Sequence, residues 1–122
     1  MGIVALLNKD ITKFVVSTNV DGLHRRSGVP PSKLAELHGD VYLETCEKCG
    51  KEYLRNFEIH GDHKHHTGRL CEDQSCAGPL KDSIINFGEN LPTHEVQITT
   101  DHSKKVIPPL LLQTPNNLTL FF

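Results

Sequence analysis

The chain has 122 residues, of which 37% are hydrophobic and 6% aromatic, and its net charge at pH 7 is -2. This length fits one globular domain with a modest core, and the near-neutral charge excludes nucleic-acid binding through a basic field over the whole chain. No apolar run reaches the roughly 18 residues of a membrane span, and the first residues lack the basic region of a signal peptide. We therefore expect an intracellular protein without a membrane partner.

The first segments predict half of an α/β unit. Residues 2–10, GIVALLNKD, are mostly good helix formers, and residues 11–18, ITKFVVST, form a β-branched run of strand length. Residues 19–33 are rich in asparagine, aspartate, glycine and proline, which is typical of a long turn. The pattern indicates a helix that leads into a buried strand, with a long turn over the carboxyl end of that strand.

Four further segments follow in chain order. A short helix is predicted over 33–39, with Ser32 as its N-cap, and a strand is predicted over 41–46. Residues 52–69 are polar and rich in histidine, which indicates an irregular insertion. Residues 80–92 return to the apolar spacing of a strand before a turn.

The cysteines form two pairs with the spacing of a metal site. The chain contains Cys46-x2-Cys49, then a gap of 21 residues, then Cys71-x4-Cys76. Each pair can direct two thiolates at one ion, and four thiolates complete the tetrahedron that zinc prefers. Such a site has no open position for water or substrate, so we expect a structural Zn(2+). The alternative is that the cysteines are unliganded core residues.

Histidines next to the second pair could compete for the same ion. They are His63, His65 and His66, in the stretch HGDHKHHTG. Because four cysteines already satisfy the metal, a solvated polar loop is the better interpretation of these histidines. The same argument leaves His38, which precedes the first cysteine pair, free for other chemistry.

The stretch VVSTNVDGLHRRSGVPPSKLAELHG, with the cysteine pairs after it, resembles the sirtuin family of NAD-dependent protein deacylases. In that family a strand leads into S-Q-N-x-D-G-L-H, then a histidine-glycine, a zinc module and an F-G-E turn. The counterparts here are STNVDGLH at 17–24, His38-Gly39, the four cysteines and Phe87-Gly88-Glu89. The phrases RSGVPPSKLAELHG, TGRLC and LKDSIINFGENLP are most similar to the class IV branch, which includes the sixth and seventh mammalian sirtuins.

The resemblance implies an α/β fold, a partial Rossmann-like sirtuin core with an inserted small zinc-binding module. Residues 1–43 correspond to the central part of the NAD-binding domain, 44–82 to the zinc-binding module, and 83–92 to a return strand and substrate-binding turn. Residues 93–122 are expected to be an atypical tail outside the family sequence. The glycine-rich segment that cradles the phosphates of NAD is not among these residues, so we expect a truncated core.

The resemblance also assigns roles to the residues after the first predicted strand. Asn19 is expected to position the reactive ribose or a water, and Asp21 to bond the carboxamide of nicotinamide, so both are cofactor-binding candidates. Thr18 stands where the family has a glutamine that contacts the NAD ribose, and its shorter side chain reaches less far. The alternative is that Asn19 and Asp21 only form Asx turns.

His38 matches the catalytic histidine of the family, a general base that takes a proton from a ribose hydroxyl. Imidazole suits this role because it exchanges protons near neutral pH. The alternative is a helix-terminal histidine in a favourable dipole contact. Phe87, Gly88 and Glu89 match the turn beside which an acyl-lysine peptide pairs as an added strand.

Two functions of different class follow. The first is an NAD-dependent protein-lysine deacylase of the histone deacetylase type, a protein mono-ADP-ribosyltransferase, or both. It implies NAD and Zn(2+) as cofactors, acyl-lysine proteins such as histone tails as substrates, chromatin association and a nuclear location. The second is a non-catalytic zinc-binding module that cannot bind NAD.

Overall fold

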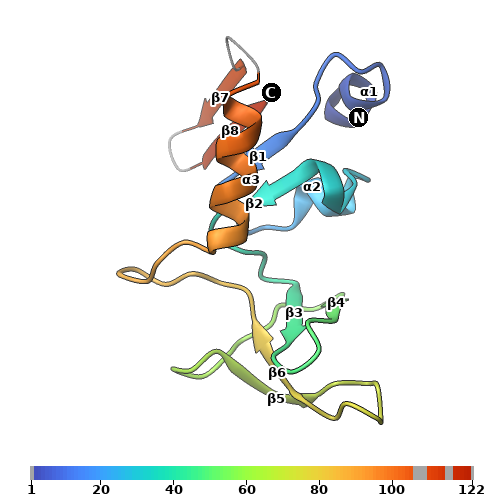
Figure 1. Cartoon of the computed structure of the whole chain (residues 1–122), viewed down its shortest axis with the longest axis vertical. Helices are drawn as coiled ribbons and strands as arrows, with labels where there is room; N and C mark the ends of the chain where they lie inside the picture. Colours follow the sequence, from blue (N-terminus) through green and yellow to red (C-terminus); the bar gives the residue numbers. More distant parts are fainter. Residues whose placement is uncertain (1, 106–109, 115–116, 122) are drawn as a thin grey trace.

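The computed structural model describes residues 2–105, 110–114 and 117–121, and places them in two four-stranded sheets. The strand order is β2-β1-β8-β7 in the first sheet and β4-β3-β6-β5 in the second. Figure 1 shows the first sheet with the helices in the upper part of the molecule and the second sheet below them. The molecule is thus an α/β part with a separate all-β module.

The first sheet is mixed. Strand β1 (Val15–Ser17) pairs in parallel with β2 (Leu34–Glu36) and antiparallel with β8 (Asn117–Phe121), which also pairs with β7 (Leu110–Thr114). The helical segments are α1 (Gly2–Asn8), α2 (Leu23–Arg26), the 3-10 turn η1 (Pro31–Lys33) and α3 (Thr93–Ser103). Within the residues described, no helix has the length and apolar character needed to cross a membrane.

Helices cover both faces of this sheet. Val15 packs with Leu34 and Leu7 of α1 on one face, while Val16 and Ala35 pack against Ile98 of α3 on the other. Successive side chains of a strand point to opposite faces, so two adjacent valines serve two cores. All three residues of β1 are buried, as expected for a strand with both faces covered.

The second sheet is antiparallel throughout. Its strands are β3 (Leu43–Cys46), β4 (Glu52–Leu54), β5 (His66–Leu70) and β6 (Pro79–Asp82). The core beneath it is small and consists of Cys46, Tyr53, Cys71 and Leu80, with Cys76 against it. So few apolar side chains give this module little hydrophobic stabilisation of its own.

A buried carboxylate ties the second sheet together. Glu44 of β3 is 0% exposed and accepts from Arg55 Nε at 2.7 Å and from Arg69 Nε at 3.0 Å. Arg55 also bonds Glu72 at 2.7 Å. Burial alone raises the pKa of Glu44, but the two arginines outweigh it and hold that pKa below its ordinary value. Glu44 is therefore a paired ion that joins β3, β5 and the chain after β4.

The predicted helix over 33–39 is wrong. Ser32 lies inside η1 and is not an N-cap, and Leu34–Glu36 form strand β2. Leu, Ala and Glu are good helix formers, but here Ala35 is fully buried beside Val16, and Leu37 N donates to Ser17 O at 2.9 Å. Pairing with β1 overrides the local preference.

Other segments also differ from expectation. The helix over 2–10 is confirmed as α1, and the strand over 11–18 as the shorter β1, but α2 lies within the predicted turn. Residues 52–69 are not irregular throughout, because they contain β4 and most of β5. The strand predicted to return within 80–92 is confirmed as β6, but its placement at 83–92 is wrong, because β6 ends at Asp82 and no described residue of 83–92 is in a strand.

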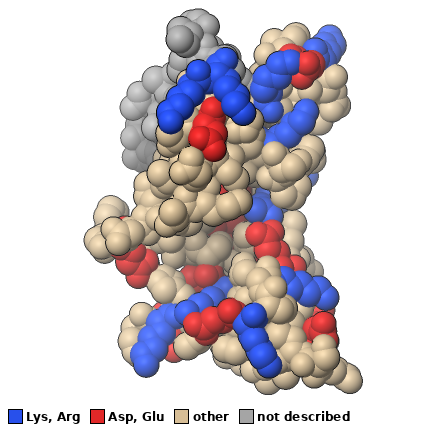
Figure 2. Space-filling model, in the orientation of Figure 1, with Lys and Arg blue, Asp and Glu red and all other residues tan. Residues whose placement is uncertain are grey.

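The charged side chains are mixed in sign on the face that Figure 2 shows, where acidic and basic residues alternate over both parts of the molecule. This mixture agrees with the near-neutral net charge of the chain.

Candidate functional site

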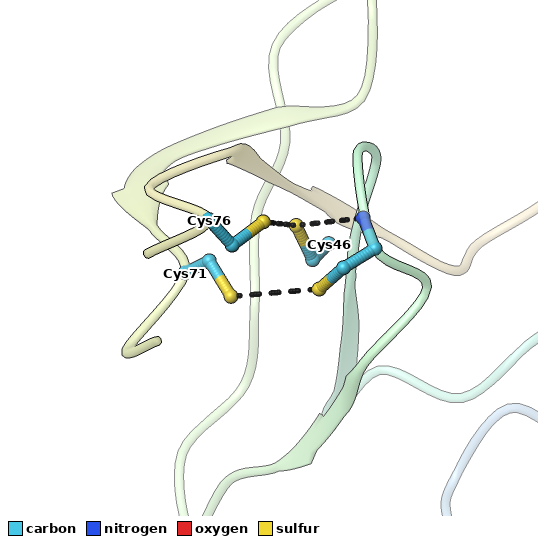
Figure 3. Close-up of side chains that lie close together, drawn as sticks. Cys46, Cys71 and Cys76 are labelled. Atoms are coloured by element: carbon cyan, nitrogen blue, oxygen red, sulfur yellow. Dashed lines mark hydrogen bonds between the residues drawn. The ribbon is translucent and has the colours of Figure 1, made fainter. Parts of the chain in front are cut away.

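The four cysteines converge on one point. Cys46 ends β3, Cys49 follows in the next turn, and Cys71 and Cys76 flank the loop after β5 (Figure 3). Their Sγ atoms all lie within 4.8 Å of one another, with Cys46 to Cys76 at 3.6 Å and Cys49 to Cys71 at 3.7 Å. Zn–S bonds of about 2.3 Å place the sulfurs of a tetrahedral site about 3.8 Å apart. The sulfur arrangement therefore fits a zinc ion.

The backbone around the cysteines builds this arrangement. Gly50 N donates to Cys46 O at 2.9 Å, which closes the first turn, and Cys71 N donates to Gly78 O at 2.7 Å. A Cβ on Gly78 would lie 2.8 Å from Cys46 Sγ, so this position requires glycine. The Cys49 N–H lowers the pKa of the Cys46 thiol to about 6, which favours the thiolate that a metal requires.

A tyrosine hydroxyl contacts the sulfur cluster from the core of the module. Tyr53 Oη lies 3.1 Å from Cys71 Sγ, and the same oxygen accepts from Glu72 N at 3.1 Å. Because Oη is already an acceptor from that N–H, its own hydrogen is available for the sulfur. Sequence reasoning missed this residue, although its position between the two cysteine pairs could have suggested it.

His38 lies in the turn after β2, and its side chain is exposed. It lines a cavity of about 450 Å³ together with residues 84–89 and Leu91. Phe87, Gly88 and Glu89 belong to that lining, and Phe87 is fully exposed. The structure thus brings the predicted base and the predicted substrate turn to one cavity, although the histidine follows a strand and not a helix.

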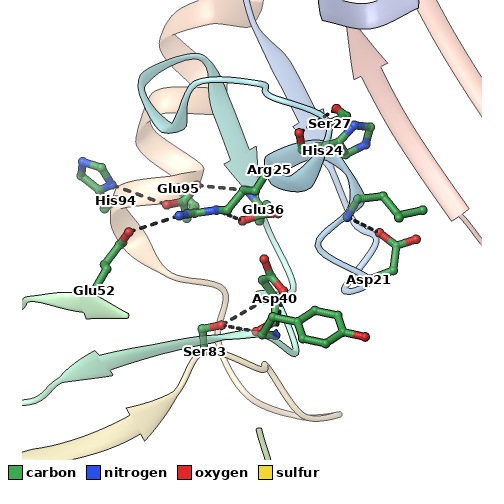
Figure 4. Close-up of polar contacts among 12 residues, drawn as sticks. Asp21, His24, Arg25, Ser27, Glu36, Asp40, Glu52, Ser83, His94 and Glu95 are labelled. Carbon is green, nitrogen blue, oxygen red and sulfur yellow. Dashed lines mark hydrogen bonds and ion pairs between the residues drawn. The ribbon is translucent and has the colours of Figure 1, made fainter. Parts of the chain in front are cut away.

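The segment after β6 is hydrogen-bonded to the turn that contains His38. Ile85 N donates to His38 O at 3.1 Å, Asp40 N donates to Ser83 Oγ at 3.0 Å, and Ser83 Oγ donates to Asp40 O at 2.8 Å. Figure 4 shows Ser83 beside Asp40 at this crossing. These bonds fix the backbone of His38 against the segment that leads to Phe87.

Close packing at this crossing makes Gly39→Ala strongly destabilising. Gly39 has a φ of +83°, and a Cβ there would lie 1.9 Å from Ser83 O. We expect the free energy of unfolding in urea to fall by about 4 kcal/mol. Gly28→Ala is the matched control, because Gly28 has a φ of +96° but nothing within 4 Å, and it should lose only about 1 kcal/mol. Equal losses would contradict the steric argument.

The residues predicted for the cofactor lie in the loop after β1. Asn19 Oδ1 is buried and has no hydrogen-bond partner among the described residues, while Asp21 Oδ1 accepts from Leu23 N at 3.1 Å. Asp21 therefore forms the Asx turn that was the alternative, and Thr18 is half-buried. None of the three lines the cavity at His38. Val41 N donates to Val20 O at 2.9 Å, so the two loops are adjacent.

Asp40, two residues after His38, is a buried acid next to the loop after β1, and sequence reasoning missed it. It is 0% exposed, its Oδ1 accepts from Tyr42 N at 2.8 Å, and its Oδ2 has no partner among the described residues. Burial raises the pKa of this carboxyl above its ordinary value. A Cβ on Gly22 would lie 2.8 Å from Asp40 Oδ1, so the loop after β1 packs directly on it.

Arg25 joins the α/β part to the second sheet (Figure 4). Its Nε lies 2.7 Å from Glu36 Oε2 and its Nη1 lies 3.2 Å from Glu52 Oε2. Glu36 N also donates to Glu95 Oε2 of α3 at 3.2 Å. Burial raises the pKa of Glu36 to about 7 in spite of the arginine. Because these residues lie far apart in the chain, no local sequence pattern indicates that they meet.

The sequence model of the Sir2 family matches residues 2–110. The expectation that family sequence ends near residue 92 is therefore wrong, because the match includes α3 and reaches β7.

Two curated relatives illustrate the likeness. The chain is 44% identical over 119 residues to the NAD-dependent protein deacetylase SRT1 of Arabidopsis thaliana, a match that covers 98% of the chain and 25% of the relative. It is 43% identical over 94 residues to the NAD-dependent protein deacetylase sirtuin-7 of Homo sapiens, covering 73% of the chain and 23% of the relative. The chain thus spans about a quarter of the length of these relatives.

Solved structures agree with the fold. A structure described as Sir2 bound to acetylated peptide is 29% identical with a TM-score of 0.52, and the match covers 81% of the chain and 40% of that protein. A Sir2 homolog–NAD complex is 22% identical with a TM-score of 0.54, over 82% of the chain and 36% of that protein, and shows the Rossmann-like α/β fold alone. The chain therefore belongs to the Sir2 family.

Proposed function

We propose that this chain carries the base, the nicotinamide-pocket loop, the substrate turn and the zinc module of an NAD-dependent protein-lysine deacylase. The observation that supports this most is the shared cavity of about 450 Å³, where His38 faces the segment with Phe87, Gly88 and Glu89. A histidine and an exposed turn on one cavity suit a base that acts beside a bound peptide. Relatives named as protein deacetylases support the same class of reaction.

His38 is the proposed general base. NAD supplies the nicotinamide leaving group and the ribose that receives the acyl group. The exposed imidazole of His38 accepts a proton from a ribose hydroxyl, and the bond between Ile85 N and His38 O keeps the ring at the cavity. The acyl-lysine peptide pairs along Phe87, Gly88 and Glu89, a role supported by the exposure of that turn and by a solved relative bound to acetylated peptide.

The loop after β1 is the proposed cofactor contact. Asn19 Oδ1 is a buried acceptor without a partner among the described residues, and such an atom is costly unless a ligand or water bonds it. An amide or hydroxyl hydrogen of NAD would satisfy it. We assign Asn19, Asp21 and Thr18 to this contact, at the carboxyl ends of the parallel pair β1 and β2, where ligands of open α/β sheets bind.

The four cysteines are the proposed ligands of a structural zinc ion, and Tyr53 is the proposed hydrogen-bond donor to one of them, Cys71. Donation from Tyr53 Oη to the Cys71 sulfur stabilises the thiolate form in the metal site. We expect zinc-loaded Tyr53→Phe to release its metal to a chelator about tenfold faster than the parent protein. Release is followed with a zinc-sensitive dye. Tyr42→Phe is the matched control and should release zinc at the parent rate, since Tyr42 stacks on Arg26 outside the module core.

The proposed function also includes a protein substrate, a second reaction and a cellular location. Histone tails as substrates, association with chromatin and a nuclear location rest on the likeness to the sirtuin-7 relative and its branch. Protein mono-ADP-ribosylation is a second outcome of the same site, because a protein nucleophile can take the place of the acyl oxygen.

An assay with NAD and an acetylated histone peptide tests the function. The proposal expects release of nicotinamide and loss of the acetyl group, and labelled NAD reports any transfer of ADP-ribose to protein. No nicotinamide at saturating NAD would instead support a non-catalytic zinc-binding module.

A further inference from the structure

His65 lies between two carboxylates from different parts of the chain. Its Nδ1 is 2.7 Å from Asp82 Oδ1 at the end of β6, and its Nε2 is 2.9 Å from Glu89 Oε1 in the substrate turn. The His65 side chain is only 22% exposed. His65 lies in the loop, as predicted, but it is paired and only partly exposed and therefore not simply solvated.

The bridge requires a protonated ring. A neutral imidazole has one N–H, so one ring nitrogen would direct its lone pair at a carboxylate oxygen less than 3 Å away. The imidazolium donates to both acceptors. Glu89 and then Asp82 raise the pKa of His65, and the Asn86 N–H and His65 lower the pKa of Glu89. Both shifts favour the charged bridge.

Glu89 also closes the turn to which it belongs. Its Oε2 accepts from Asn86 N at 2.8 Å, and Glu89 N donates to Asn86 O at 3.1 Å. One carboxylate oxygen thus shapes the turn while the other bonds His65. Phe87 and Gly88, between these residues, are exposed and have no hydrogen-bond partner among the described residues. The position of the turn therefore depends on the Glu89 side chain.

We propose that His65 is a positioning residue for the acyl-peptide cleft, by which we mean the cavity between His38 and the Asn86–Glu89 turn. His65 holds this turn against the zinc module through the bridge from Asp82 to Glu89. This inference rests on the proposed function, because it assigns the turn to peptide binding. Held in place, the turn presents its backbone as an edge for an added strand. Released, it must be ordered again at each binding event, which costs affinity.

The surrounding charges set the direction of the pH dependence. Asp82 and Glu89 face the ring, Lys81 lines the same hollow, and Asp62, Lys64 and His66 are its neighbours on the loop. The raised pKa of His65 makes the bridge fully charged below the ordinary value of 6.5, and it is lost as the pH rises through the higher folded value. Below the lowered pKa of Glu89 the bridge is lost again.

Hydrogen exchange in the zinc-loaded protein tests the bridge without any substrate. The variant is His65→Asn, because His65 has a φ of +68° and asparagine tolerates that conformation but does not reach Glu89. Exchange over residues 86–89 is divided by the intrinsic rate and measured from pH 5.5 to 8.5. We expect about fivefold faster exchange than the parent at pH 6, and a parent rate that rises toward the variant's at high pH.

Two further variants and one binding measurement complete the test. Glu89→Gln breaks the ion pair from the other side without altering the backbone at His65, and should match His65→Asn. His66→Gln is the control, since His66 Nε2 lies 3.2 Å from Glu47 Oε2 and does not bond the turn. An acetyl-lysine peptide should bind His65→Asn about fivefold more weakly at pH 6.

The outcomes separate the two proposals. Unchanged exchange in both bridge variants, or parent exchange that does not vary with pH, overturns the role of His65. Faster exchange with unchanged peptide affinity keeps the bridge and overturns its role in the cleft. A parent protein that never binds the peptide refutes the proposed function, while exchange still judges the bridge.

Discussion

Replacing His38 with alanine should lower the rate of nicotinamide release with NAD and an acetyl-lysine peptide by about a hundredfold to ten-thousandfold. The reason is the loss of the proposed base at the cavity beside Phe87, Gly88 and Glu89. The exposed His38 ring makes no hydrogen bond within the described part of the chain, so its removal leaves no buried group without a partner. Peptide affinity and the urea midpoint should therefore stay within experimental error of the parent values.

His94→Ala is the matched control, because the His94 side chain is 81% exposed on α3 and lies outside the cavity. It should retain the parent rate. A His38→Ala protein with parental kcat would remove His38 from the chemistry, even if the family relationship stands. Loss of peptide binding together with kcat would show that the histidine supports the cleft and not the proton transfer.

The residues of the candidate site could be predicted where they lie in short, contiguous motifs. STNVDGLH, His38-Gly39 and the cysteine pairs each place their functional atoms within a few residues, so backbone geometry alone brings them together. The four sulfurs within 4.8 Å agree with the spacing of the two pairs. The β-branched run at β1 was also recognisable, because adjacent β-branched residues such as Val15 and Val16 favour a strand.

The missed features depend on contacts between distant segments. Strand β2 contains helix-forming residues and becomes a strand only because β1 lies beside it. His65 is a bridging residue because β6 and the Asn86–Glu89 turn place Asp82 and Glu89 on either side of it, 17 and 24 residues away in sequence. Glu44 meets Arg55 and Arg69 in the same way. No local pattern encodes such pairs.

Removal of the metal should unfold the second sheet and leave the first in place. We expect Cys46→Ser, or chelation of the parent protein, to remove stoichiometric zinc and with it about 10 kcal/mol of binding free energy. The module core contains two of the ligands, Cys46 at 1% and Cys71 at 6% exposure, and otherwise mainly Tyr53 and Leu80. That core cannot hold four strands without the ion, because it buries too little apolar surface.

Elemental analysis measures the zinc, and hydrogen exchange localises the unfolding. Protection should vanish over residues 43–82 but persist in β1 and β2, whose cores are made with α1 and α3. Ser75→Ala is the control, because Ser75 lies between Cys71 and Cys76 but, among the residues described, its hydroxyl bonds only Asp73. A folded, metal-free parent protein would contradict the zinc site. Loss of the module should also release Glu89 from His65, so the substrate turn would lose its position although no ligand of the metal touches it.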